Sequence, residues 1–203
     1  MPADLTDPVS SAGRAPSGRP APGPTVLSRL AGTDATTFDS EYWGRRPLLA
    51  RGVDPDGFRD LLDLDGVDEL LSRRGLRTPF IRVARDGAVV DSASFTGGGG
   101  VGAEITDQVR DDRVATLFAE GHTVVLQALH RTWPAVLELS TRLAAELGHP
   151  VQANAYVTPP TSRGFSAHYD VHDVFVLQIT GEKRWRIHAP VLVDPLRSQP
   201  RGR

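Results

Sequence analysis

The chain has 203 residues, of which 39% are hydrophobic and 24% charged, a formal net charge of −2 and no cysteine. The lack of thiols excludes disulfides, zinc fingers, iron–sulfur clusters and cysteine nucleophiles, and the balanced charge gives no reason to expect direct nucleic-acid binding. No apolar run approaches the roughly 20 residues that cross a bilayer and no secretory signal starts the chain, so we expect a cytoplasmic protein without a membrane partner. Without cysteine, any metal ion would have to be held by histidine and carboxylate.

The pattern along the chain predicts one domain between two tails. Residues 1–25 alternate Pro with Ser, Gly and Ala and hold no aromatic residue, so they bury too little apolar surface to offset the entropy of ordering. We predict a disordered Pro-rich tail there, a domain over residues 26–193, and a second disordered tail over residues 194–203.

The first part of the domain is expected to be helical. Aromatic residues between 38 and 43 recur at helical spacing, and residues 48–50 then predict a short strand. Residues 56–74 carry apolar side chains in a pattern typical of two short helices interrupted at Gly66.

A hairpin and a further helix follow. Asp86-Gly87 lies between the apolar runs of residues 79–84 and 88–95, which predicts a β-hairpin. Residues 97–100 are four glycines that form a flexible loop. A helix is predicted from Thr106, as its N-cap, to Glu120.

Strands dominate the C-terminal half and are expected over residues 122–129, 151–158, 173–180 and 183–188. Between the first two of these strands we expect a helix that begins at Thr132 and Pro134 and ends at Gly148. Gly181-Glu182 makes the last pair a hairpin. Helices followed by antiparallel strands predict an α+β fold whose sheet carries the chemistry.

His168-Tyr169-Asp170 is the motif with the clearest chemical meaning. Side chains two residues apart on extended backbone point to the same side, so the imidazole and the carboxylate can converge on one metal ion. They would supply two members of the facial triad that binds non-haem Fe(II). The alternative is a surface loop with two polar residues.

Two neighbouring residues leave alternatives open. His172 would share the face of His168 on a straight strand, but the two Cα atoms would be about 13 Å apart, which is too far for one metal ion. Lys183 begins the second strand of the predicted hairpin. Inside a barrel it needs an anion such as a dicarboxylate, whereas on the surface it is a solvated hairpin lysine.

Several stretches, in order and with compatible spacing, resemble the JmjC-type ribosomal-protein hydroxylases, the ribosomal oxygenases of the cupin-like 2-oxoglutarate/Fe(II) oxygenase superfamily. These stretches are YWGRRPLL (42–49), NAYVTPP (154–160), HYDVHDVFVLQ (168–178) and GEKRWR (181–186). The resemblance covers about residues 38–190. It implies N-terminal helices with a partial double-stranded β-helix, that is, a cupin/JmjC-like jelly roll.

The resemblance also implies a site and a reaction. His168 and Asp170 match two Fe(II) ligands, and Lys183 matches the basic residue that pairs with the distal carboxylate of the co-substrate 2-oxoglutarate. Asn154 and Tyr156 fall where the family places polar residues near that co-substrate. The implied substrate is a side chain of a ribosomal protein, hydroxylated at carbon, and a homodimer is compatible with the family.

One departure from the family pattern bears on activity. The family's third ligand is a histidine on a later strand, several tens of residues beyond the first, and this chain ends at Arg203. His188 does not match the distal position. We therefore expect a domain that is incomplete at its C-terminal end and weak or inactive by itself. The alternatives are a truncated, non-catalytic binding or assembly module, and a cupin-type metal protein that uses His168, Asp170 and His172.

Overall fold

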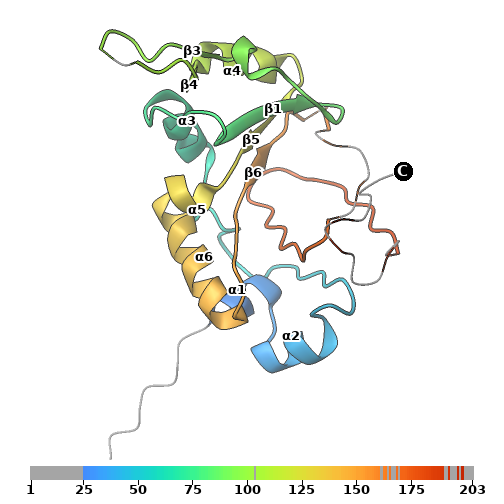
Figure 1. Cartoon of the computed structure of the whole chain (residues 1–203). Coiled ribbons are helices and arrows are strands. Elements are labelled where there is room, and N and C mark those ends of the chain that lie inside the picture. Colours follow the sequence, from blue (N-terminus) through green and yellow to red (C-terminus); the bar gives the residue numbers. More distant parts are fainter. Residues whose placement is uncertain are drawn as a thin grey trace, which may run out of the picture.

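The computed structural model describes residues 25–102, 104–160, 162–163, 165, 168, 170–189, 192, 196 and 198. Apart from Thr25, Leu196 and Ser198, the predicted tails lie outside the described residues. In this part of the chain, helices pack against an antiparallel sheet (Figure 1). The α+β class is therefore confirmed, and the arrangement is consistent with a partial JmjC/cupin fold. None of the described helices is long and apolar enough to span a membrane.

Two short helices begin the fold. The hydroxyl of Thr25 caps α1 (Val26–Ala31), and the carboxylate of Asp34 caps α2 (Ala35–Glu41), because each accepts a backbone N–H that has no partner inside its helix. Glu146 of the long helix α6 (Pro134–Leu147) also accepts the first two amides of α1, at 2.9 and 2.7 Å. This contact attaches the beginning of the domain to α6.

Two predictions for the next segment are wrong. Residues 48–50 form no strand, and Gly66 does not interrupt a helix but lies inside α3 (Leu64–Ser72). The carboxylate of Asp63 caps α3 by accepting the Gly66 amide at 2.8 Å. A Cβ atom at position 66 would lie 2.9 Å from the ring of Trp133, so glycine is present for close packing and not as a helix breaker.

The main sheet has four strands in the order β2-β1-β5-β6, all antiparallel to their neighbours. The strands are β1 (Ile81–Arg85), β2 (Ala88–Val89), β5 (Thr123–Leu126) and β6 (Ala155–Val157). The hairpin predicted at Asp86-Gly87 is confirmed, with both turn residues at positive φ, as a tight hairpin turn requires. Its second strand is shorter than predicted, since the 3-10 helix η1 (Ser92–Ser94) follows closely.

A second, two-stranded sheet replaces part of a predicted helix. Strand β3 (Thr96–Gly97) pairs with β4 (Gln108–Val109), and α4 (Asp111–Ala119) begins after β4 instead of at Thr106. Val109 is buried and donates its amide to Leu76 at 2.9 Å. The burial of Val109 and its backbone pairing therefore outweigh the helix that the sequence pattern predicts from Thr106 onward.

The predicted α6 is confirmed, with Pro134 at its first turn and Gly148 at its C-cap with φ 70°. A short helix that the sequence does not predict, α5 (Leu129–Thr132), joins β5 to α6. The pair Glu138 and Arg142 lies on the exposed side of α6, with 3.7 Å between charged atoms.

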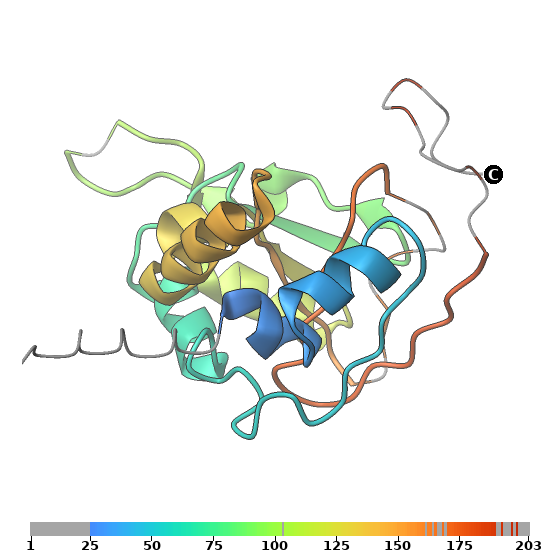
Figure 2. The ribbon, with the colours of Figure 1, turned by 90° about the horizontal axis from the view of Figure 1, so that it is seen from below.

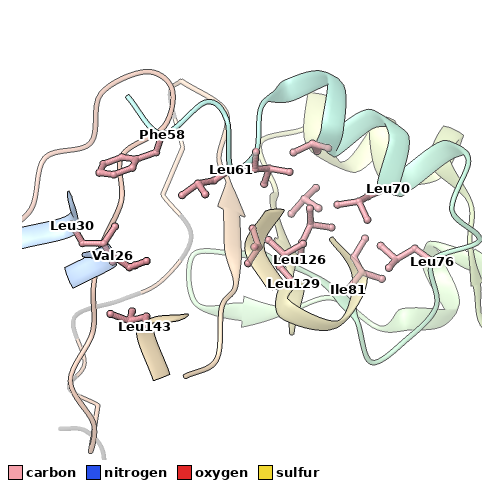
Figure 3. Packing of buried hydrophobic residues seen from close by; sticks show 14 of the residues in the cluster. Val26, Leu30, Phe58, Leu61, Leu70, Leu76, Ile81, Leu126, Leu129 and Leu143 are labelled. Carbon is pink, nitrogen blue, oxygen red and sulfur yellow. The ribbon is translucent and has the colours of Figure 1, made fainter. Parts of the chain in front are cut away.

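One face of the main sheet forms the hydrophobic core with the helices. Ile81 and Leu126 lie opposite each other on β1 and β5 and pack beside Leu70 of α3, Leu76 and Leu129 (Figure 3). Figure 2 shows α1 beneath α6, on the same side of the molecule. Along β1 and β5 the members of the core cluster alternate, with Ile81 and Val83 opposite Leu126 and Val124. On the opposite face Ala84, Thr123 and Val125 are fully buried as well, so the centre of the sheet is covered on both faces.

The described residues from 170 to 189 form no strand, so the predicted strands 173–180 and 183–188 and their hairpin are wrong for this structure. Figures 1 and 2 show this segment as a ribbon without arrows. Phe175, Leu177 and Ile179 pack against the core while Val174 and Val176 are exposed. The side chains thus alternate as in a strand, but none of the described strands pairs with this segment to supply the hydrogen-bond ladder that a sheet needs.

Candidate functional site

The main sheet has a second face, opposite the helical core. Arg82, Val125 and Tyr156 are register partners across β1, β5 and β6, and partners in an antiparallel sheet project to the same side. The preceding and following residues of each strand point to the core. We call this second side, defined by Arg82, Ala84, Thr123, Val125 and Tyr156, the site face.

The loop after β6 returns over the site face. The ring of Phe165 packs edge-to-face on Tyr156, with 5.9 Å between centroids, and the Arg82 guanidinium lies 5.3 Å from the Phe165 centroid. On the other side, Phe165 contacts the imidazole of His168 at 6.2 Å in an edge geometry. This loop therefore carries the predicted metal motif to the sheet.

His168 and Asp170 face each other. The Nε2 atom of His168 lies 4.0 Å from Oδ2 of Asp170, and the two side chains are 53% and 37% exposed. The structure thus brings together the imidazole and carboxylate that the motif predicts to converge, and both remain accessible to an ion from solvent.

Lys183 comes close to the same group of residues. Its ammonium lies 5.9 Å from the ring centroid of Tyr156 and 5.0 Å from that of Trp185. These distances are within the range of cation–π contacts. Residues 181–189 are exposed throughout, so Lys183 lies at the open edge of the site and not inside a closed barrel.

Asn154 has a structural contact in this arrangement. Its Oδ1 accepts the Ala128 amide at 3.0 Å and a side-chain N–H of Gln152 at 3.4 Å. Ala128 has a left-handed backbone conformation at the turn between β5 and α5. The carbonyl of Asn154 therefore fixes this turn, while Tyr156, two residues later, projects from the site face.

The remaining candidate histidines do not complete a metal site. Over the ranges of the chain that the structure describes, no three His, Asp or Glu side chains are grouped closely enough to hold a metal ion. His172 and His188 are described and exposed, but neither joins His168 and Asp170. The three-ligand set of His168, Asp170 and His172 is therefore not assembled in this structure.

Sequence reasoning missed Arg82 and Phe165. The signal for Arg82 was present, since a single cation between Ile81 and Val83 in a strand must project from the face opposite the core. Phe165 lies in a stretch rich in Pro, Ser and Gly and follows no period. Only the folded chain shows that its ring joins the sheet to His168.

Comparison with known proteins agrees with the motifs. A model of the JmjC domain matches residues 131–201, a range that includes β6, His168, Asp170 and Lys183. The chain is 28% identical over 158 residues to the bifunctional lysine-specific demethylase and histidyl-hydroxylase NO66 of Aedes aegypti, which covers 78% of this chain and 24% of that protein.

Two further relatives show the same pattern. Ribosomal oxygenase 1 of Gallus gallus is 28% identical over 158 residues, with 75% of this chain and 24% of that protein covered. The NO66 protein of Drosophila mojavensis is 26% identical over 154 residues, with 76% and 16% covered. The chain thus spans about a quarter or less of the length of these curated relatives. The predicted resemblance is confirmed: the chain is similar to ribosomal oxygenases and carries a match to the JmjC domain.

Proposed function

We propose that this chain carries part of the catalytic site of an Fe(II)- and 2-oxoglutarate-dependent protein hydroxylase of the JmjC/ribosomal oxygenase type. The observation that carries the proposal is the approach of the His168 imidazole and the Asp170 carboxylate to 4.0 Å on an accessible loop over the site face. Relatives with the names histidyl-hydroxylase and ribosomal oxygenase support a ribosomal protein as the substrate.

The donor atoms fit a metal ion in type and nearly in distance. Imidazole nitrogen and carboxylate oxygen are ligands of the facial triad of non-haem iron. With metal–ligand bonds of about 2.0–2.2 Å, two ligand atoms at right angles lie about 3 Å apart. The observed 4.0 Å is about 1 Å longer, and a rotation of either exposed side chain can close this gap.

Each of the other site residues has a proposed task. Lys183 donates to the distal carboxylate of 2-oxoglutarate, and the Tyr156 ring beneath its ammonium orients the lysine and covers one side of the site. Asn154 acts indirectly, since its side-chain carbonyl accepts the Ala128 amide and so fixes the turn between β5 and α5. Bound Fe(II) would supply the activation of dioxygen, the oxidant of the reaction: one oxygen atom goes into succinate as 2-oxoglutarate loses carbon dioxide, and the other enters the substrate C–H bond as hydroxyl.

We further propose that turnover by this chain alone is weak or absent. Two protein ligands hold an ion less tightly than three, and the described residues provide only His168 and Asp170. A second candidate function is a non-catalytic binding or assembly module. This module is favoured by exposed apolar side chains, since Val174, Val176, Trp185 and Ile187 are 54–71% exposed.

The test is a titration of the full chain with Mn(II), a redox-stable substitute for Fe(II), with and without 2-oxoglutarate. We expect Mn(II) binding that 2-oxoglutarate strengthens, loss of at least tenfold in affinity in Asp170→Asn, and no change in His188→Ala, an exposed histidine outside the pair. In a parallel assay with Fe(II), succinate release should be slow or undetectable.

The outcomes separate the candidates. If the unfolding temperature of the folded chain does not change when Mn(II) and 2-oxoglutarate are added, the result contradicts the hydroxylase site and supports the binding module. Rapid succinate release would confirm the site and contradict the expected weak activity. Metal affinity lost in His172→Ala but kept in His188→Ala would instead favour a cupin-type metal protein that uses His168, Asp170 and His172.

A further inference from the structure

Phe165 connects the sheet to the metal motif. Its ring contacts three side chains from different parts of the fold: Arg82 of β1, Tyr156 of β6 and His168 of its own loop. Phe165 itself is half-buried. Since no aliphatic side chain offers the faces and edges used in these contacts, the ring is suited to join the loop and the two strands.

Arg82 holds one side of this ring. Its strand pairs with β5 over four residues, so the base of the side chain is fixed. Its Nε atom is buried and, within the described residues, has no hydrogen-bond partner. A buried N–H without an acceptor disfavours the folded state. Arg82 is therefore a poor choice for stability alone, and its observed contact is with the Phe165 ring.

Tyr156 holds the other side. It lies opposite Val125, which is fully buried, so its backbone position is fixed by the strand pairing. The perpendicular packing of Tyr156 and Phe165, with an interplanar angle of 86°, is a favoured aromatic geometry. The Phe165 ring thus lies between Arg82 of β1 and Tyr156 of β6, the two strands on either side of β5. We call this arrangement the clamp.

His168 receives the edge of the Phe165 ring, with 6.2 Å between the centroids and 69° between the ring planes. The imidazole and the Asp170 carboxylate are each more than a third exposed. A ligand side chain loses rotational entropy when a metal ion fixes it. Contacts that orient a ligand before binding reduce that loss, and removing such contacts typically costs 10–100-fold in metal affinity.

We infer that Phe165, clamped by Arg82 and Tyr156, is a positioning residue that sets the place of the His168 imidazole relative to Asp170. This inference rests on the proposed metal site and names residues that act through His168 and do not touch the metal ion. It assigns Arg82, whose charge lacks an acid partner among the described residues, to this task.

The experiment measures Mn(II) affinity and urea stability of the full chain in parallel. Phe165→Leu should weaken Mn(II) binding about 10–100-fold, whereas Phe165→Tyr, which keeps the ring, should bind as the wild type does. Arg82→Met should weaken Mn(II) binding several-fold without loss of stability, because it removes a buried polar atom that has no partner.

Arg74→Met is the matched control. It removes a similar contact, a guanidinium 5.7 Å from the ring of Trp133, at a place remote from the loop, and should leave the Mn(II) affinity unchanged. Arg82→Met keeps the test decisive if Phe165→Leu does not fold.

The inference is overturned if Arg82→Met and Phe165→Leu lower stability but leave Mn(II) affinity unchanged, since that result indicates a purely structural role. It is also overturned if Arg74→Met weakens binding as much as Arg82→Met does. A wild-type chain that binds no Mn(II) overturns the proposed function, and the positioning role with it. Weak binding in the variants beside normal binding in the wild type and in Arg74→Met supports both.

Discussion

The hydroxyl groups of Thr123 on β5 and Thr158 after β6 form a hydrogen bond that attaches the beginning of the loop after β6 to the sheet, and its contribution to stability can be measured. Their Oγ1 atoms are 3.0 Å apart. Thr123 is fully buried, whereas Thr158, the first residue after β6, is only partly buried. Replacing one partner of a hydrogen bond should therefore have unequal effects on the two sides.

The magnitudes follow from this difference in exposure. In Thr123→Val, the Thr158 hydroxyl can turn toward water, so the free energy of unfolding should fall by about 0.5–1.5 kcal/mol, the net value of one hydrogen bond. In Thr158→Val, the Thr123 hydroxyl stays buried without a partner, and the cost should be about 1–3 kcal/mol. The double variant should be close to neutral, because both polar groups are gone and the shape is kept.

Urea denaturation of the four proteins in this cycle measures the coupling, which should be about 1.5–4.5 kcal/mol, the sum of the two single costs when the double variant is neutral. Thr106→Val, at an exposed position, is the control for the intrinsic effect of the substitution. If the effects of the two single changes simply add in the double variant, or if Thr158→Val is the milder change, the hydroxyl contact does not hold the loop and the reasoning fails.

Two further predictions concern the scaffold. Gly66→Ala should destabilise the chain by about 1 kcal/mol, because the overpacking cost of about 1–3 kcal/mol against Trp133 exceeds the roughly 0.5–1 kcal/mol that alanine gains in a helix. Trp133 cannot easily move away, since its indole N–H donates a 2.8 Å hydrogen bond to the Leu61 carbonyl. Urea denaturation beside the exposed control Asp68→Ala measures the change, and a stabilised Gly66→Ala would contradict the prediction. The Arg77 guanidinium, with help from the Thr78 hydroxyl, lowers the pKa of Asp107 below its usual 3.8, so its contribution to stability is present above pH 3.8 and is lost as the pH falls through the lower, folded-state value. Thermal unfolding between pH 6 and 2.5 should thus show a steeper acid loss in the wild type than in Asp107→Asn, and parallel curves would refute this linkage.

The sequence predicted those elements whose signals are local. Pro134 and Gly148 bracket α6, and Asp86-Gly87 marks the β1-β2 turn, because these residue types favour the backbone conformations that a helix end and a tight turn need. Gly66 misled the prediction for a related reason. Its role depends on the ring of Trp133, far along the chain, and no local pattern contains that information.

The C-terminal half shows a different limit. Along residues 174–179 the side chains that pack on the core alternate with exposed ones, which is the period of the predicted strand. A strand, however, also requires a partner with free backbone groups at the right distance, and side-chain periodicity does not report this. The same distinction applies to the site: the spacing of His168 and Asp170 predicted their approach, while Phe165 became visible only through contacts from β1 and β6.

The two faces of the main sheet explain why stability and site geometry can be tested separately. Side chains such as Val83 and Val124 point into the helical core, and their neighbours Arg82 and Val125 project from the site face. A substitution at Arg82 therefore leaves the helix–sheet packing in place, whereas one at Val83 would open a cavity in it. Because the described ring contacts run from His168 through Phe165 to Arg82 and Tyr156 on the site face, a loss of metal affinity at unchanged stability is evidence about positioning. The same loss in a core variant would report only a damaged scaffold.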